Sequence, residues 1–206
     1  MRERPILFSA PMVRAILDGS KTQTRRIVTP QGSEMQREVM PDGRTIGWRT
    51  NVRHAHGWTT VNICPYGAPG DRLWIKEAFR VCFVGACCFG EYAAGGERLH
   101  SDGFDTEQAA RFLRKGSAWS PAIHMPRWAS RLTLDVAGVR VERLQEITAD
   151  DAVREGINPS EVPGVGSDHA LVDAFQKLWD SINGKHSPWS SNPWVWVVSF
   201  RRLVLT

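Results

Sequence analysis

Apolar and polar positions follow a clear pattern near the start of the chain. Residues 4–8 read as a short strand with consecutive apolar residues from Ile6 to Phe8, and apolar residues then recur at helical spacing up to Leu17. Ser9 is a favoured helix N-cap, and Pro11 stands in the first turn, where its missing N–H costs nothing. Gly19 is expected to end the helix in the left-handed conformation. The pattern therefore predicts a strand followed by a short amphipathic helix.

The residues directly after this helix lie outside the periodic pattern. We expect Lys21 and Thr24 on a loop anchored by the helix, and a second strand over 25–29. A further strand is predicted over 72–76, behind the turn that Pro69 and Gly70 indicate.

The pattern sharpens again in the last third of the chain. Apolar residues alternate from 132 to 136, and the strand is expected to continue or to pair with residues 139–141. Residues 148–151 have the form of a capping box, so a short helix is predicted up to Gly156. The clearest amphipathic helix spans 168–182.

The final strand is predicted over 194–205. It carries apolar residues on both faces at its start, which indicates a central position in a sheet. The elements show no repeating β–α–β order. They therefore predict an α+β fold with a small mixed sheet or barrel and helices at its edges.

Two long stretches are poor in periodic pattern and rich in Gly and Pro. The first, 31–68, reads as an excursion with a hairpin near Asp42 and Gly43, and the second, 81–120, as irregular chain with a helix over 106–114. Loops of this length in a compact domain are usually functional lids or mobile insertions.

Length and charge narrow the class of protein. The chain has 206 residues, of which 42% are apolar, and carries a net charge of +4. This length suits one domain over 1–206, interrupted by insertions at 31–68 and 81–120. The modest basic excess favours an anionic partner only weakly. No stretch approaches the ~18 apolar residues of a membrane span or the form of a signal peptide, so we expect a cytoplasmic protein.

The segment from Gly19 to Arg26 gathers the most chemistry. It holds the amine of Lys21, the hydroxyl of Thr24 and two guanidinium groups within a few residues. A lysine with a depressed pKa can take the proton of a hydroxyl, and nearby cations favour that depression. A solvated basic turn is the alternative reading of the same residues.

Glu155 is a second candidate, because a carboxylate at a helix C-terminus meets an unfavourable dipole. Its alternative is an exposed side chain paired with Arg154 or Lys177. Arg127 beside Trp128 suits phosphate and base recognition, but it equally suits a strand edge with arginines reaching to solvent. The four cysteines lack zinc-like spacing, so no metal is expected.

These residues carry a resemblance to a known family. Ile6-Leu7-Phe8-Ser9, followed by Ile16-Leu17-x-Gly19-x-Lys21-Thr22-x-Thr24-x-Arg26, resembles the opening of ASCH domains, which are small PUA-like β-barrels associated with RNA. The longer phage and prophage members are the most similar. They pair this opening with segments like Pro126-Arg127-Trp128-Ala129-Ser130-Arg131, Leu178-Trp179-Asp180-Ser181-Ile182-Asn183-Gly184 and Asn192-Pro193-Trp194-Val195-Trp196. The resemblance implies a PUA-like mixed β-barrel flanked by helices.

One bacterial branch of that family consists of N(4)-acetylcytidine amidohydrolases with a Lys, Thr and Glu catalytic set. The motif of that branch matches Lys21 and Thr24, and the helix around 147–157 places its glutamate at Glu155. The resemblance thus implies removal of an acyl group from N(4)-acylcytidine-type nucleosides, with no cofactor. Arg26, or a backbone N–H in the loop, would stabilise the oxyanion of this reaction.

The remaining expectations concern the partner. Trp74 and Trp128 are candidates to stack on a base, with Arg127 beside them. Two other functions stay open on the sequence. The same residues could bind RNA or a modified base without cleaving it, or they could form a ribonuclease that needs no metal.

Overall fold

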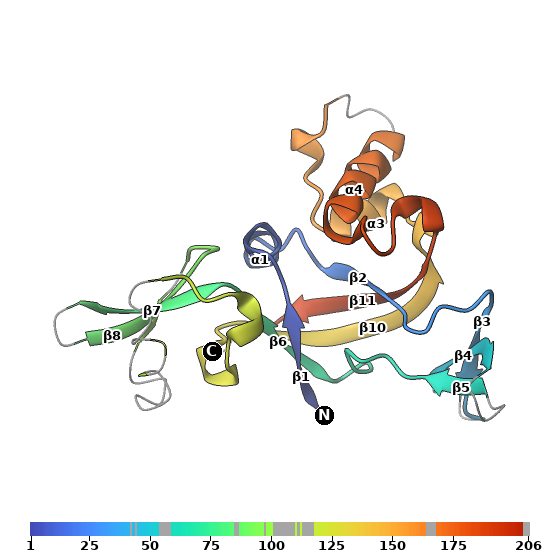
Figure 1. Ribbon diagram of the computed structural model, residues 1–206, viewed down its shortest axis with the longest axis horizontal. Coiled ribbons are helices and arrows are strands. Elements are labelled where there is room, and N and C mark those ends of the chain that lie inside the picture. The colour runs from blue at the N-terminus through green and yellow to red at the C-terminus, as the bar shows by residue number, and fades with distance from the viewer. Residues whose placement is uncertain are drawn as a thin grey trace. The chain divides into compact units, whose positions relative to one another are not determined.

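The computed structural model shows a chain of helices and several sheets (Figure 1). It describes residues 1–41, 43, 45–53, 59–84, 87–96, 98–100, 110, 112, 118–163 and 168–203. The chain divides into two compact units. The first comprises Met1–Gly19, Gly70–Asp135 and Arg201–Thr206, and the second comprises Ser20–Pro69 and Val136–Phe200.

Five strands form a mixed sheet in the order β1-β6-β10-β11-β2. Their bounds are β1 (Glu3–Leu7), β6 (Arg72–Lys76), β10 (Thr133–Arg143), β11 (Trp194–Arg202) and β2 (Gln23–Ile27). β1 runs parallel to β6, whereas β6 pairs antiparallel with β10 and β11 pairs antiparallel with β2. The strands predicted near 4–8, 72–76, 132–141 and 194–205 are thereby confirmed, and β11 is an inner strand as expected.

In the first unit, β1 leads into helix α1 (Ala10–Leu17), with Ser9 as N-cap and Gly19 at φ +84°. The predicted stop of this helix is therefore confirmed. A separate sheet contains β7 (Phe79–Val84), β8 (Cys87–Tyr92) and β9 (Leu99–His100). Its apolar core lies over Phe79, Val81, Tyr92, Phe112, Met125 and Ala129. Two 3₁₀ turns, Ala122–His124 and Arg127–Ala129, precede β10.

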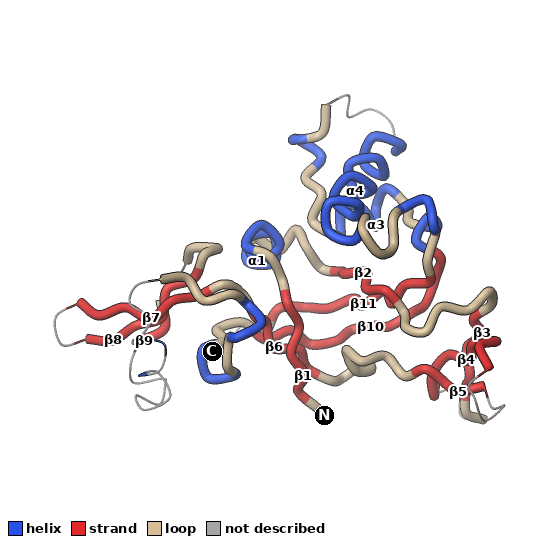
Figure 2. Tube along the Cα trace, viewed as in Figure 1, coloured by secondary structure: helices blue, strands red, loops and turns tan. Residues whose placement is uncertain are grey.

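The second unit contains β2, most of β10 and β11, and two helices, α3 (Ala149–Arg154) and α4 (Asp168–Asn183). These helices lie together on one side of the strands (Figure 2). Their apolar faces bury Phe175 and Trp179 against Val195 and Val197 of β11. Further 3₁₀ turns cover Leu144–Glu146, Pro159–Glu161 and Trp189–Ser191. Ile182 does not join the core predicted for α4, since its side chain is 57% exposed at the last turn.

The stretch 31–68 also folds into a three-stranded sheet, with β3 (Met35–Val39), β4 (Thr45–Arg53) and β5 (Thr59–Asn62). The antiparallel pairing of β3 with β4 confirms a hairpin here. Gly43 adopts φ +83° in its connection, while Asp42 lies outside the described residues. The helix predicted over 106–114 also lies largely outside them, although Ala110 and Phe112 are helical.

The fold class is α+β, as predicted. The described strands form open sheets, and no closed barrel is found among them. The chain divides into two compact units. That residues 1–206 form one domain with two insertions stays a prediction. Within the described part of the chain, no helix combines the length and the apolar character that a membrane span requires.

Candidate functional site

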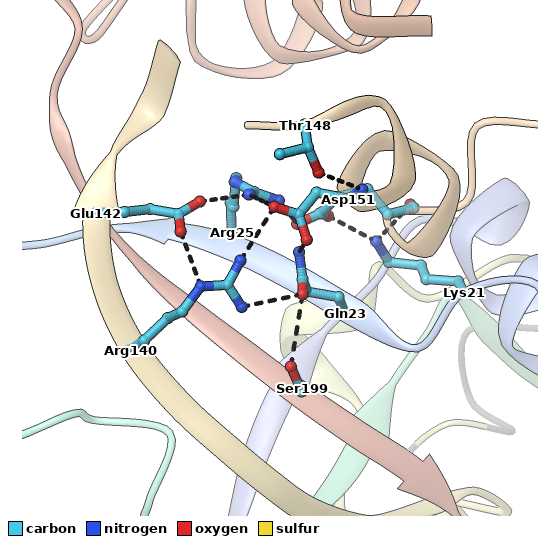
Figure 3. Close-up of polar contacts among 9 residues, drawn as sticks. Lys21, Gln23, Arg25, Arg140, Glu142, Thr148, Asp151 and Ser199 are labelled. Carbon is cyan, nitrogen blue, oxygen red and sulfur yellow. Dashed lines mark hydrogen bonds and ion pairs between the residues drawn. The ribbon is translucent and has the colours of Figure 1, made fainter. Parts of the chain in front are cut away.

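Lys21 lies in the second unit, in the loop that links α1 to β2. The loop is tied to the end of α3, because the N–H of Thr22 donates to the carbonyl of Arg154 over 2.9 Å. This tie directs the side chain of Lys21 toward α3, as Figure 3 shows. Lys21 is only 2% exposed, so the sequence alternative of a solvated basic turn is wrong for this residue.

The partner of Lys21 is Glu155. The ammonium nitrogen donates to the backbone carbonyl of Glu155 at 2.6 Å and to its carboxylate Oε2 at 3.0 Å. Glu155 is the C-cap of α3, directly before Gly156 at φ +95°. Two nearby cations therefore offset the unfavourable dipole that the sequence indicated at this helix end.

The second cation is Arg25, whose Nη1 donates to Glu155 Oε1 at 3.2 Å. The alternative of an exposed Glu155 paired with Arg154 or Lys177 is therefore wrong, because this carboxylate is buried between Lys21 and Arg25. The structure thus brings together two residues, Lys21 and Glu155, that are 134 positions apart in the sequence.

Arg25 is the centre of a larger cluster of buried charges. Its Nη2 contacts Asp151 Oδ2 at 2.8 Å and also Glu142 of β10. The guanidinium is fully buried, and its central carbon lies 5.8 Å from the ring centroid of Phe175. Three carboxylates from two elements therefore surround one arginine of β2.

Polar side chains complete the hydrogen bonding of Asp151. Gln23 donates to Asp151 Oδ1 at 3.1 Å, and Arg140 donates to Asp151 Oδ2 at 3.1 Å (Figure 3). Arg140 also donates to Glu142 at 2.8 Å. Lys21, Arg25 and Arg140 thus balance the carboxylates of Glu142, Asp151 and Glu155. Among the described residues, no cluster of His, Cys, Asp and Glu is placed to hold a metal ion.

Burial controls the protonation of Lys21. Desolvation lowers the pKa of its ammonium, and the neighbouring guanidinium groups of Arg26 and Arg25 lower it further, whereas Glu155 raises it. The desolvation effect is the largest, so the pKa lies below its ordinary value of 10.5. A larger fraction of neutral amine is therefore present at a given pH than for a solvated lysine.

Thr24 lies within β2, so the prediction that it stands on a loop is wrong. Hydrogen bonding to β11 extends the strand two residues earlier than the sequence pattern indicates, with Thr24 opposite Val198. Side chains alternate along a strand, which puts Thr24 on the face opposite to Gln23 and Arg25. The side-chain contacts described for Lys21 are with Glu155, whereas Thr24 is placed by its pairing with β11.

Arg26 shares the face of Thr24 and lies opposite Trp196 of β11. Its charge acts on Lys21, and the charge of Glu155 acts on it in turn. Arg26 is therefore electrostatically coupled to the Lys21–Glu155 pair although it lies on the other face of the strand.

The remaining predicted site residues belong to the first unit. The ring of Trp74 in β6 lies beneath two cations, with Lys76 Nζ at 5.6 Å and the guanidinium carbon of Arg127 at 5.9 Å from its centroid. Arg127 also pairs with Glu3 at 3.0 Å. Trp128 packs against the apolar core of that unit, with its ring 6.0 Å from that of Phe112. A substrate-binding role for Trp74, Arg127 and Trp128 stays a prediction.

Sequence reasoning missed the acidic partners of Arg25. The only signal was Asp151, which stands where the commoner capping box has Glu. The structure explains this choice. Thr148 accepts from the Asp151 N–H at 3.1 Å, but the Asp151 carboxylate points to Gln23 and Arg25 instead of closing the box.

Comparisons with known proteins add no family to this geometry, since neither a family model, nor a curated protein, nor a solved structure matches the chain.

We predict that Arg25→Met destabilises the protein strongly. The change leaves the carboxylates of Glu142, Asp151 and Glu155 without their shared cation, and breaking a buried pair in this way costs about 3–5 kcal/mol. Urea denaturation measures the loss. Arg49→Met is the matched control, because Arg49 pairs with Glu38 at the surface and such pairs contribute about 0–1 kcal/mol. Equal losses in the two variants would contradict a buried charge cluster.

A second prediction concerns acid stability. Burial alone would raise the pKa of Asp151, but Arg25, Gln23 and Arg140 together bring it below its ordinary value of 3.8. The stabilisation is therefore present above that value and is lost as the pH falls through the folded-state pKa. Asp151→Asn should be less stable than wild type near neutral pH, and this difference in stability should narrow as the pH falls below 3.8.

Urea titrations at several pH values measure that gap. Asp135→Asn is the control, since Asp135 forms a partly exposed pair with Arg72. A gap for Asp151→Asn that stays constant over the acid range would show that the Asp151 carboxylate carries no such stabilisation.

Proposed function

We propose that this protein is an amidohydrolase that removes the acyl group from N(4)-acylcytidine-type nucleosides, with Lys21, Thr24 and Glu155 as its catalytic residues. The observation that supports this proposal most is the buried amine of Lys21, held by Glu155 and shifted toward its neutral form. A neutral lysine amine is the form that can act as a general base.

The reaction would proceed in two steps. The Lys21 amine takes the hydroxyl proton of Thr24 as the Thr24 oxygen adds to the acyl carbonyl carbon. The bond from that carbon to N4 of cytosine then breaks, and Lys21 returns the proton to N4. Water, deprotonated by Glu155, cleaves the resulting threonine ester and releases the carboxylic acid and the hydroxyl of Thr24.

The first step requires the Thr24 hydroxyl to come within hydrogen-bond reach of Lys21. Such contacts are often long in the absence of substrate and tighten in the complex. Arg26 shares the strand face of Thr24, which suits it to stabilise the oxyanion that forms there. Arg25 holds the Glu155 carboxylate and so limits its orientation.

The fold that accompanies this proposal is the PUA-like barrel of ASCH domains, in a single domain with two insertions. In this reading the mixed sheet is the core of that domain, and the three-stranded sheets at 31–68 and 81–120 are the insertions. Nucleosides or RNA would be the partners.

The proposal predicts that purified protein releases cytidine and acetate from N(4)-acetylcytidine. Lys21→Ala should lower this turnover by at least about 100-fold, the lower end of what a general base contributes. Chromatography of the nucleosides measures it, and thermal unfolding checks that the variant folds. Lys177→Ala is the control, because Lys177 is an exposed lysine of α4. Full turnover by the Lys21→Ala variant would reject the mechanism.

A module that binds RNA or a modified base without cleavage is the second candidate. The observation that favours it is the charge balance of the cluster, in which the carboxylates of Glu142, Asp151 and Glu155 each contact a cation. Such a balanced cluster can serve structure alone.

Salt dependence separates the two candidates. Nucleoside turnover should change little between about 50 and 200 mM salt, whereas RNA binding through several phosphates should weaken steeply. The experiment follows turnover of N(4)-acetylcytidine and retention of labelled RNA on a filter across that range. Steep loss of RNA retention without any turnover would favour the binding module, and fragmentation of the RNA without added metal would indicate a ribonuclease.

A further inference from the structure

The sheet of residues 31–68 meets the Arg26 face of the mixed sheet through one tryptophan pair. Trp196 of β11 lies opposite Arg26 and shares its face. The ring of Trp48 in β4 meets that of Trp196 edge to face, with centroids 4.9 Å apart. Both tryptophans are buried, so this part of the second unit is shielded from water.

Two polar side chains stand beside Trp48 on the same face of β4 and β5. Thr50 follows Trp48 by two positions, and Asn62 lies directly opposite Trp48 in the register. A Cβ at Gly47 would come within 2.7 Å of the Asn62 carbonyl, so glycine there permits the close approach of the two strands. The backbone thereby fixes where these side chains lie.

Both side chains carry a buried polar atom that lacks a hydrogen-bond partner in the described part of the chain. These atoms are Thr50 Oγ1 and Asn62 Nδ2, and Thr50 is only 1% exposed. A buried polar atom left without a partner costs roughly 1–3 kcal/mol. Such atoms are rare in folded proteins, and a ligand that supplies their hydrogen bonds explains them.

We propose that Thr50 and Asn62 read the base edge of a cytosine nucleoside bound against the Thr24 and Arg26 face of β2. The Asn62 amide would donate to N3 or O2 of the base, and the Thr50 hydroxyl oxygen would accept from the N–H at N4, which an acylated base keeps. This inference rests on the proposed function, since it takes its ligand from there. It assigns base recognition to the 31–68 segment.

The test is isothermal titration with cytidine, the product of the proposed reaction. Thr50→Val and Asn62→Leu should each weaken cytidine binding about 5–10-fold, the effect of one lost hydrogen bond. Thr50→Ser, which keeps the hydroxyl, should bind nearly as wild type. Thr45→Val is the control, because it makes the same change at an exposed position of β4.

Thermal unfolding without cytidine gives an independent readout. Thr50→Val should be as stable as wild type or more stable, since it removes an orphan polar atom from the interior. Wild-type affinity in a folded Thr50→Val protein, or no cytidine binding by wild type, would overturn the inference. A less stable Thr50→Val that binds cytidine normally would assign the hydroxyl to a buried water instead and would also overturn it.

The outcome is separable from that of the proposed function. Cytidine binding that depends on Thr50 and Asn62, in a protein that does not hydrolyse N(4)-acetylcytidine, would keep the inference and reject the enzyme. Hydrolysis of N(4)-acetylcytidine by a protein whose cytidine affinity is unchanged in both variants would keep the enzyme and reject the inference.

Discussion

The buried guanidinium of Arg25 is the constraint on which the candidate site depends. A buried cation is strongly unfavourable unless carboxylates surround it, and here they come from β10 and from α3. Because Glu142, Asp151 and Glu155 all contact one arginine of β2, the strands β2 and β10 and the helix α3 are held in a single arrangement. Lys21 gains its position from the same arrangement, since the residue that it contacts, Glu155, is already held by Arg25.

The alternation of side chains along β2 separates two environments. Gln23 and Arg25 project into the charge cluster beside α3, whereas Thr24 and Arg26 lie on the other face of β2, opposite Val198 and Trp196 of β11. The proposed chemistry needs both environments, because a base on one side must reach a hydroxyl on the other. Lys21 lies in the loop just before β2 begins at Gln23. The direction of its side chain is therefore not set by the alternation of side chains along the strand.

The spacing of apolar residues predicted the helices and strands that pack a face into the core, such as α4 and β11. Burial of one face requires apolar residues at the period of the helix or strand. The sheets within 31–68 and 81–120 were not predicted beyond one hairpin, since short strands rich in glycine and polar residues leave little period to detect. The proximity of Lys21 and Glu155 followed from a family resemblance and not from their spacing. The pairing of Arg25 with Asp151, 126 positions away, could not be read from one sequence, because nothing local links them.

The protonation of Lys21 is the property that joins this geometry to the proposed chemistry. Nuclear magnetic resonance of the Lys21 side-chain carbon next to the ammonium, followed across the alkaline range, measures the pKa of Lys21 directly. Because burial outweighs the attraction of Glu155, the pKa of Lys21 should lie below its ordinary value of 10.5. A measured pKa of Lys21 at or above 10.5 would contradict the account.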